Sequence, residues 1–344
     1  MKHFTSTNVD RLSRRDFLKV ASGVGLSAAG MALLEACGVK PATPKSEGAP
    51  LETTTIRIGY YPVICLAPWF MAEDLLKSEG FTDVQFVDPQ TKFDFCMQFA
   101  GPSLLNRDPG TLLLAGVDTG CWELLGNDKV NKIADLKGKT IGITPVGGFD
   151  HEYVSILLAY VGLDSNKDVT WTPDLDAAEV EKRFADGTID ALLAWPPYSQ
   201  ELRAKKIAHT VVNSMMDKPW SQYFCSMVTA YGGFAQKYPV ATKRVVRAVL
   251  RAADICDREK ERTAQAMVDR GITPNYDYAL EAVTMIPFNH WREYDPEDTL
   301  RFYALLLRDA GLIQGNPDDV IKQAADFHYF NEIKVELKDE GRSK

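Results

Sequence analysis

Apolar and polar positions follow two different periods along residues 55–344, one typical of strands and one typical of helices. Six short apolar runs predict strands, at residues 56–60, 84–87, 111–117, 140–143, 169–171 and 189–194. Apolar residues at helical spacing predict helices before residue 76 and at residues 150–161, 177–185, 240–256, 258–270, 276–285 and 296–310. Strands that alternate with helices are typical of parallel sheets covered by helices. We therefore predict an α/β fold of two halves, with a cleft where the loops after the strands converge.

The first 36 residues have the organisation of an export signal. Arg14 and Arg15 precede an apolar, Gly/Ala-rich run at residues 20–34, and this segment ends at Cys37. The paired arginines predict twin-arginine export of a folded protein. The cysteine predicts cleavage after residue 36 and attachment of lipid to Cys37, which would anchor the protein outside the cytoplasm on the cell membrane. An ordinary transmembrane helix or an uncleaved signal is the alternative. Residues 37–54 contain three prolines and predict a flexible tether.

Charge and cysteine content narrow the possible partners. Without residues 1–36 the chain has 34 basic and 44 acidic side chains, a net charge of −10, which argues against a nucleic-acid partner. Five cysteines remain besides Cys37: Cys65, Cys96, Cys121, Cys225 and Cys256. They form no C-x-x-C pair, so a zinc or redox motif has no support. We expect them to be small buried side chains in the reduced state.

The loops predicted to face the cleft are rich in aromatic side chains. The candidate ligand-binding residues are Tyr61, Cys65, Trp69, Phe95, Asp118, Thr119, Gly147, His151, Trp195, Tyr198, Trp220 and Tyr223. Flat, rigid rings favour a planar heteroaromatic ligand, because each stacked ring adds about 0.5–1.5 kcal/mol beyond area burial. Any one of these aromatics, taken alone, is more often a core residue. A small anion would instead need hydroxyl groups, backbone N–H groups such as those near Gly147, and cationic side chains, and the cations near these loops are few.

Four motifs point to a known family. They are IRIGY at residues 56–60, AGV at 115–117, DLKGKTIG at 135–142 and GTIDA at 187–191. In this order and spacing they resemble the solute-binding proteins of ABC importers for nitrate, aliphatic sulfonates and taurine, whose relatives bind thiamine-pyrimidine precursors or are assigned to riboflavin. The resemblance extends from residue 56 to about residue 337. Only residues 89–93 lie between the second strand and Asp94-Phe95, where the family usually has a helix and a short strand, so we expect one wall of the first lobe to be shortened or rebuilt.

The resemblance implies a periplasmic-binding-protein fold of type II, in which two crossings between two α/β lobes act as a hinge. We place these crossings near Leu136 and near Met227. This assigns residues 55–136 and 228–344 to lobe 1 and residues 137–227 to lobe 2. A monomer without cofactor or metal would capture a small-molecule solute between the lobes and deliver it to ABC permease and ATPase subunits.

The sequence therefore predicts a membrane-anchored solute-binding component of an ABC importer, specific for a planar aromatic or heteroaromatic nutrient of the thiamine-pyrimidine or riboflavin type. One alternative is a binding protein for an aliphatic sulfonate, taurine or nitrate. Another is a pyrimidine-biosynthetic enzyme or a ligand-sensing protein. The sequence contains no G-x-S-x-G, H-E-x-x-H, P-loop or dinucleotide fingerprint, and no cysteine cluster like the iron site of the biosynthetic relative, which disfavours the enzyme.

Overall fold

The computed structural model describes residues 49–105, 110–173 and 176–342, and all of them belong to one compact unit. The predicted export signal at residues 1–36 and the predicted lipid site at Cys37 lie outside the described residues. Among the helices of the described part, none combines the length and the apolar composition that crossing a bilayer requires.

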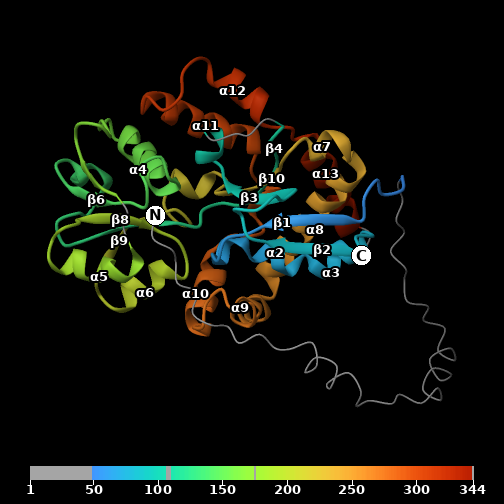
Figure 1. The fold of residues 1–344 in the computed structure, drawn as a ribbon, viewed down its shortest axis with the longest axis horizontal. Coiled ribbons are helices and arrows are strands. Elements are labelled where there is room, and N and C mark those ends of the chain that lie inside the picture. The colour runs from blue at the N-terminus through green and yellow to red at the C-terminus, as the bar shows by residue number, and fades with distance from the viewer. Residues whose placement is uncertain (1–48, 106–109, 174–175, 343–344) are drawn as a thin grey trace, which may run out of the picture. The chain divides into compact units, whose positions relative to one another are not determined.

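Two five-stranded sheets form the centres of two lobes (Figure 1). The sheet of lobe 1 has the strand order β2-β1-β3-β10-β4, and that of lobe 2 has the order β7-β6-β8-β5-β9. The strands of lobe 1 are β1 (Thr55–Gly59), β2 (Asp83–Val87), β3 (Phe95–Phe99), β4 (Leu112–Asp118) and β10 (Ser226–Ala230). The strands of lobe 2 are β5 (Glu123–Gly126), β6 (Thr140–Gly142), β7 (Thr170–Thr172), β8 (Ala191–Ala194) and β9 (His209–Asn213). The predicted α/β class with two lobes is confirmed.

Both sheets are mixed, although the sequence predicted parallel ones. β10 runs antiparallel to β3 and β4, and β5 runs antiparallel to β8 and β9. β5 and β10 are the strands that the chain enters directly after it crosses from the other lobe. Because each crossing delivers the chain to the edge at which the neighbouring strands end, the next strand must run away from that edge.

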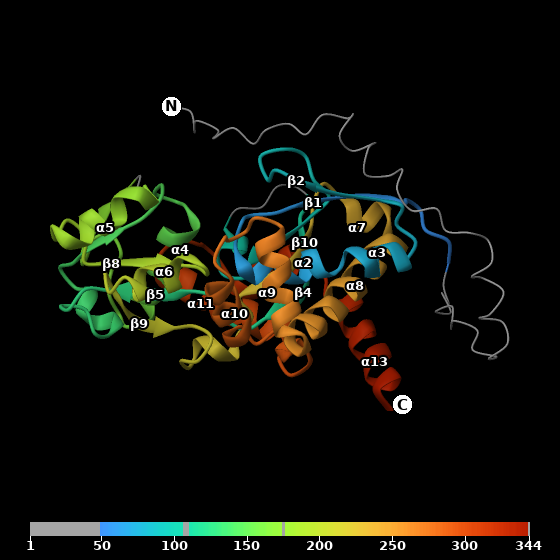
Figure 2. The same cartoon turned by 90° about the horizontal axis from the view of Figure 1, so that it is seen from below.

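Helices accompany both sheets (Figure 2). Those of lobe 2 are α4 (Phe149–Tyr160), α5 (Ala177–Ala185) and α6 (Tyr198–Ala204). Those of lobe 1 are α2 (Ala67–Met71), α3 (Glu73–Ser78), α7 (Phe234–Lys237), α8 (Pro239–Arg258), α9 (Lys260–Asp269), α10 (Tyr276–Met285), α11 (Pro296–Asp309), α12 (Pro317–Ala324) and α13 (His328–Arg342). α11 starts with an N-cap, because the Asp295 side chain accepts a hydrogen bond from Glu297 N (2.8 Å) and Pro296 follows it. α11 also packs against α4, so it contacts both lobes.

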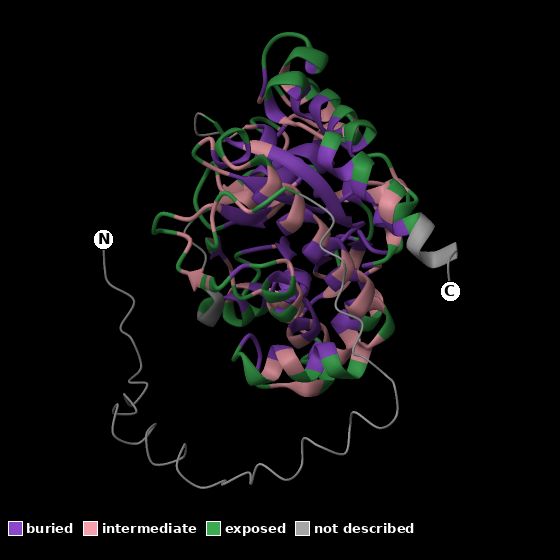
Figure 3. Cartoon of the chain, turned by 90° about the vertical axis from the view of Figure 1, so that its right-hand side faces the viewer, coloured by how far each residue is buried: buried purple, intermediate pink, exposed green. Residues whose placement is uncertain are grey.

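Buried residues are concentrated in the strands and on the inner faces of the helices (Figure 3). The largest apolar cluster includes Ile58 and Leu114 of lobe 1 and Ile141 and Leu157 of lobe 2. Within β4, Gly116 leaves room for the ring of Phe224, which occupies the space that a Cβ would need. The glycine of the AGV motif therefore permits close packing of β4 in lobe 1.

The two crossings lie at residues 119–122 and 214–225. The first crossing was predicted near Leu136, but β5 precedes that residue and already pairs with β8 and β9 of lobe 2. β5 has only four residues and directly follows the crossing, so its sequence pattern was too short to be recognised as a strand. Gly120 has φ +88°, and the backbone of Ser214 lies where its Cβ would be, so the two crossing segments meet closely there. The second crossing ends at β10, one residue before Met227.

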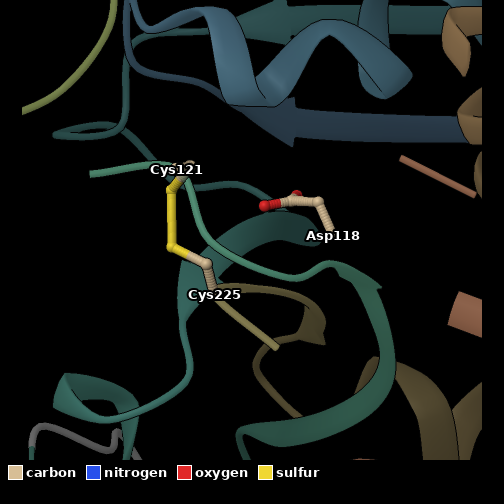
Figure 4. Close-up of side chains that lie close together, drawn as sticks. All are labelled: Asp118, Cys121 and Cys225. Carbon is tan, nitrogen blue, oxygen red and sulfur yellow. A yellow bond between two sulfur atoms is a disulfide. The ribbon is translucent and has the colours of Figure 1, made fainter. Parts of the chain in front are cut away.

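A disulfide joins the two crossings, since Cys121 lies in the first and Cys225 at the end of the second (Figure 4). The expectation that all five cysteines are reduced is therefore wrong for this pair, because the topology brings together two residues that are 104 positions apart. Cys65, Cys96 and Cys256 are free and buried, as expected.

The end of the predicted tether is part of lobe 1. The Glu52 carboxylate accepts hydrogen bonds from the backbone N–H groups of Val240 and Ala241 (2.9 Å each) in the first turn of α8. The carbonyl of Ala49 accepts a hydrogen bond from Arg244 (3.0 Å). Residues 49–54 were predicted to be flexible because they are polar and proline-containing, but a carboxylate can cap a helix that is distant in the sequence.

Candidate functional site

The carboxyl ends of strands from both sheets meet at the boundary between the lobes. In lobe 1, β1, β3 and β4 end there, and in lobe 2, β6 and β8 end there (Figure 1). The backbone N–H of Ile64, after β1, donates to the carbonyl of Pro196, after β8 (3.2 Å). Loops at such strand ends are where open α/β sheets bind ligands.

Four aromatic residues face one another across this boundary, and we call them the cleft aromatics: Tyr61, Phe99, Phe149 and Trp195. Phe99 of lobe 1 stacks on Trp195 of lobe 2, with ring centroids 5.2 Å apart and planes at 24°. Phe99 and Tyr61 also contact Phe149 edge-on, at 5.4 and 6.4 Å. All four are only half-buried. Partly exposed rings from both lobes are thus available to a molecule between the lobes.

A cavity of about 300 Å³ adjoins the cleft aromatics and is lined by residues of both lobes. Lobe 2 contributes Gly147, Gly148 and Phe149, and lobe 1 contributes polar groups that include Gln98 and Ser103. This volume lies at the small end of ligand sites in proteins. None of the described residues that line it carries a formal charge.

The loop before α4 is held in place by Asp150. The buried Asp150 carboxylate accepts hydrogen bonds from the Thr144 N–H (2.6 Å), the Thr144 hydroxyl (2.9 Å) and the His151 N–H (2.9 Å). Gly147 has φ +80°, a conformation that other residues rarely adopt. The loop therefore presents Gly147 and Gly148 to the cavity in a fixed conformation.

His151 was predicted to bind ligand, and in the structure it supports this loop. Its Nδ1 accepts a hydrogen bond from the Gly147 N–H (3.3 Å), and its ring packs edge-on against Trp171 at 4.6 Å. Burial lowers the pKa of His151 and the neighbouring Asp150 opposes this shift, so the neutral imidazole that can accept the bond is favoured.

Asp118 is the last residue of β4 and is fully buried beside the disulfide (Figure 4). Neither carboxyl oxygen has a hydrogen bond of good geometry within the described residues. Burial raises the pKa of Asp118 to about 8, although the neighbouring Ser226 hydroxyl lowers it somewhat. The carboxyl group is therefore mostly protonated at neutral pH. Thr119, the next residue, pairs its hydroxyl with Nδ1 of His290 (2.9 Å).

The other predicted ligand residues lie in three different places. Cys65, Trp69 and Phe95 are fully buried in lobe 1, where Trp69 contacts Phe95 at 6.4 Å. Trp220 and Tyr223 pack on Phe302 of α11, the latter stacked at 3.9 Å. Tyr198 is half-buried at the start of α6 in lobe 2, and burial raises the pKa of its hydroxyl. The structure thus brings Tyr61, Gly147 and Trp195 of the predicted set to the cavity and the cleft aromatics.

Sequence reasoning missed Phe99, Phe149 and Tyr153. Phe149 directly follows the Gly147-Gly148 pair that was selected, so its position was a usable signal. Phe99 ends β3, a strand that the pattern did not reveal. Tyr153 lies one turn into α4, fully buried, and contacts Phe99 at 6.0 Å and Trp122 at 5.5 Å.

Comparison with known proteins identifies the fold. A sequence model of the NMT1-like family matches residues 117–270. No curated protein sequence matches this chain. The periplasmic nitrate-binding protein NrtA of Synechocystis PCC 6803 superposes with a TM-score of 0.64 at 13% identity, covering 84% of this chain and 90% of that one. The alkanesulfonate-binding protein SsuA of Xanthomonas axonopodis pv. citri superposes with a TM-score of 0.61 at 17% identity, covering 77% of this chain and 96% of that one.

One structure of similar fold is an enzyme. The desulfurization enzyme DSZB superposes with a TM-score of 0.56 at 18% identity, covering 82% of this chain and 99% of that one. At these identities the likeness concerns the fold, and a fold can carry binding or catalysis. The chain has the two-lobed fold of the periplasmic binding proteins, as the sequence predicted.

Proposed function

We propose that this chain is the solute-binding component of an ABC-type importer related to the nitrate and sulfonate systems, and that its solute is a small planar aromatic or heteroaromatic molecule. The observation that carries the proposal is the stack of Phe99 of lobe 1 on Trp195 of lobe 2 beside a cavity shared by both lobes. The NMT1-like match and the nitrate- and sulfonate-binding proteins of the same fold support the transport role.

The cleft aromatics favour a planar solute. A ring that enters between Phe99 and Trp195 would replace one stacking contact by two, and this gain would favour the closed arrangement of the lobes. The indole N–H of Trp195 is buried and has no hydrogen-bond partner within the described residues, so it can donate a hydrogen bond to an acceptor atom of the solute. The described residues that line the cavity carry no formal charge, and such a lining is a poor match for nitrate, taurine or a sulfonate, which are recognised by cationic or strongly donating groups.

The same proposal includes the export route and the partners. A lipid on Cys37 would hold a monomer on the outer side of the membrane, where it would deliver solute to permease and ATPase subunits. Replacement of Cys37 by alanine is expected to release the protein into the soluble fraction without a change in solute affinity. A Cys37→Ala protein that stays in the membrane fraction would contradict the lipid anchor.

Solute binding is tested on the purified protein. Native mass spectrometry will reveal any solute that co-purifies with the protein. If the mass of the solute is unchanged after incubation with the protein, the protein binds the solute and does not convert it. Tryptophan quenching is then titrated with riboflavin, a thiamine pyrimidine, taurine and nitrate. We expect a response to a heterocycle, weakened at least tenfold in Trp195→Leu and Phe99→Leu. Phe86→Leu is the matched control, because Phe86 is a half-buried β2 residue that packs on Tyr60 and Phe70 of lobe 1. Tight taurine or nitrate binding without a response to heterocycles would refute the aromatic solute.

A further inference from the structure

We propose that Asp118 recognises the solute through its carboxyl group, and that the solute presents an N–H donor next to a hydrogen-bond acceptor on a planar nitrogen heterocycle. This inference rests on the proposed function, which it makes more specific. It assigns a polar recognition point to a site that is otherwise described by its aromatic residues.

The first argument is the missing partner of Asp118. Its side chain is fully buried, and neither oxygen has a hydrogen bond of good geometry within the described residues. Buried polar groups are nearly always satisfied, because leaving one unpaired costs its whole desolvation free energy. The Ser226 hydroxyl, on the paired residue of β10, is the nearby group that affects the carboxyl most, and one hydroxyl cannot satisfy both oxygens.

The second argument is the position of Asp118 between the lobes. It ends β4 at the edge where the strands of both lobes meet. The pKa of the Tyr153 hydroxyl, on α4 in lobe 2, is raised mainly by burial, then by Tyr303 and then by the charge of Asp118. Tyr153 contacts Phe99, which stacks on Trp195. Ser226 of β10 pairs with both Phe99 and Asp118, so these two side chains lie on the same face of the sheet. A ring held between Phe99 and Trp195 can direct a polar edge toward Asp118 from this face.

A metal ion is a poor occupant of this position. Asp118, Cys121 and Cys225 lie close enough together to suggest a ligand set, but both sulfur atoms are bonded to each other in the disulfide. A disulfide offers no thiolate, and the thiolate is the form of cysteine that binds metals. The carboxyl group would remain as a single ligand.

The protonation state of Asp118 defines the chemistry of the solute. A neutral carboxylic acid donates one hydrogen bond from its O–H and accepts one at its carbonyl oxygen. Its match is a ring nitrogen acceptor beside an exocyclic amine, as in an aminopyrimidine, or the carbonyl and N–H of a flavin imide. An anionic sulfonate or nitrate offers acceptors alone and would leave the carbonyl oxygen of Asp118 unpaired.

Asp118 titrates among groups that stay neutral. Burial raises the pKa values of the Cys65 thiol in the turn after β1, the Tyr153 hydroxyl on α4 and the Cys256 thiol on α8. His290 contacts Thr119, the residue after Asp118, so a His290→Gln variant is included as a control. The affinity should be constant up to about pH 7 and fall as Asp118 ionises near pH 8.

The test titrates wild type, Asp118→Ala and Asp118→Asn with riboflavin and with 4-amino-5-hydroxymethyl-2-methylpyrimidine. We expect Asp118→Ala to bind the responding probe at least tenfold more weakly. Asp118→Asn keeps a donor and an acceptor, so it should stay within about threefold of wild type and lose the fall in affinity above pH 8. Asp254→Asn is the control, since Asp254 pairs with Arg292 in lobe 1 outside the cleft.

The outcomes separate the two proposals. A probe that binds wild type and Asp118→Ala equally overturns the role of Asp118 and leaves the proposed function standing. Failure of both probes to bind wild type overturns the inference, and tight taurine or nitrate binding in the same assay overturns the aromatic solute as well. If Asp118→Ala does not fold, the comparison of Asp118→Asn with wild type across pH decides: equal profiles overturn the inference, and loss of the alkaline fall supports it.

Discussion

Replacement of Cys121 and Cys225 together by alanine tests how strongly the disulfide stabilises the folded protein. The bond connects the two crossings, so it closes all five strands of lobe 2 into one loop. Removing the bond leaves the hydrogen bonds between the crossings in place. These include Trp122 N to the Ser214 hydroxyl (2.9 Å) and Ser214 N to the Trp122 carbonyl (3.0 Å). The folded structure should therefore persist, and the main change should be in the unfolded chain.

The expected loss of stability follows from the size of the loop. A cross-link between residues 104 positions apart restricts the unfolded chain, and the chain-entropy relation gives about 4.7 kcal/mol for a loop near this length. Domains are usually stable by 5–15 kcal/mol in total. The double variant should therefore lose a large fraction of its free energy of unfolding and remain folded at 25 °C.

The assay is guanidinium unfolding followed by tryptophan fluorescence at pH 7, with and without reductant. Cys96→Ala and Cys256→Ala are matched controls, because both residues are buried and free; they measure the loss of a buried sulfur without loss of a cross-link. Reduced wild type should unfold close to the double variant. Denatured wild type should also have two more reactive thiols after reduction than before it.

Two results would refute this reasoning. A double variant that loses no more free energy of unfolding than the single controls would show that the bond does not restrict the unfolded chain. An unchanged thiol count after reduction would show that the bond is not formed in the isolated protein.

Three further predictions concern single carboxylates. The contribution of Asp118 to stability should fall as pH rises from about 4 to about 8, because the unfolded Asp118 carboxyl ionises before the buried one, whose pKa is about 8. In Asp118→Asn this component should be absent, so by pH 8.5 the variant should be the more stable protein, by up to ~5 kcal/mol; parallel denaturation curves across this range would contradict the shift. Glu52→Gln should lower the free energy of unfolding by about 1 kcal/mol through the weakened cap of α8, and an unchanged guanidinium midpoint would show that the cap contributes nothing. Asp150→Asn should speed hydrogen exchange at the Thr144 amide by roughly 5- to 150-fold, corresponding to about 1–3 kcal/mol; unaltered exchange would mean that other contacts hold the loop.

Elements with a strong local pattern could be predicted from the sequence. The helix at residues 276–285 begins and ends at the predicted residues, and Asn275 caps it by accepting from Tyr278 N (3.1 Å). β5, β9 and β10 were missed because they are strands of four or five residues with no alternation that separates them from loops. Their direction depends on the crossings, which no local pattern encodes.

The sequence predicted a cleft with aromatic residues, but it identified only some of the rings that lie there. Aromatic residues after strands indicated a cleft with rings, and Tyr61 and Trp195 lie there. Trp69 and Phe95 have the same residue types and similar positions, but packing within lobe 1 buries both completely. Which rings remain partly exposed depends on how the two lobes meet, and that contact joins residues distant in the sequence.

The attachment of residues 49–54 to lobe 1 determines which lobe would be held at a membrane. Glu52 and Ala49 bind to α8, so a lipid on Cys37 would be separated from lobe 1 by the 11 residues 38–48, a span of at most about 40 Å when fully extended. Lobe 1 would then be the stationary part on the membrane surface. Under the proposed transport function, opening and closing around solute would be a movement of lobe 2, and we expect a permease to sense the position of that lobe.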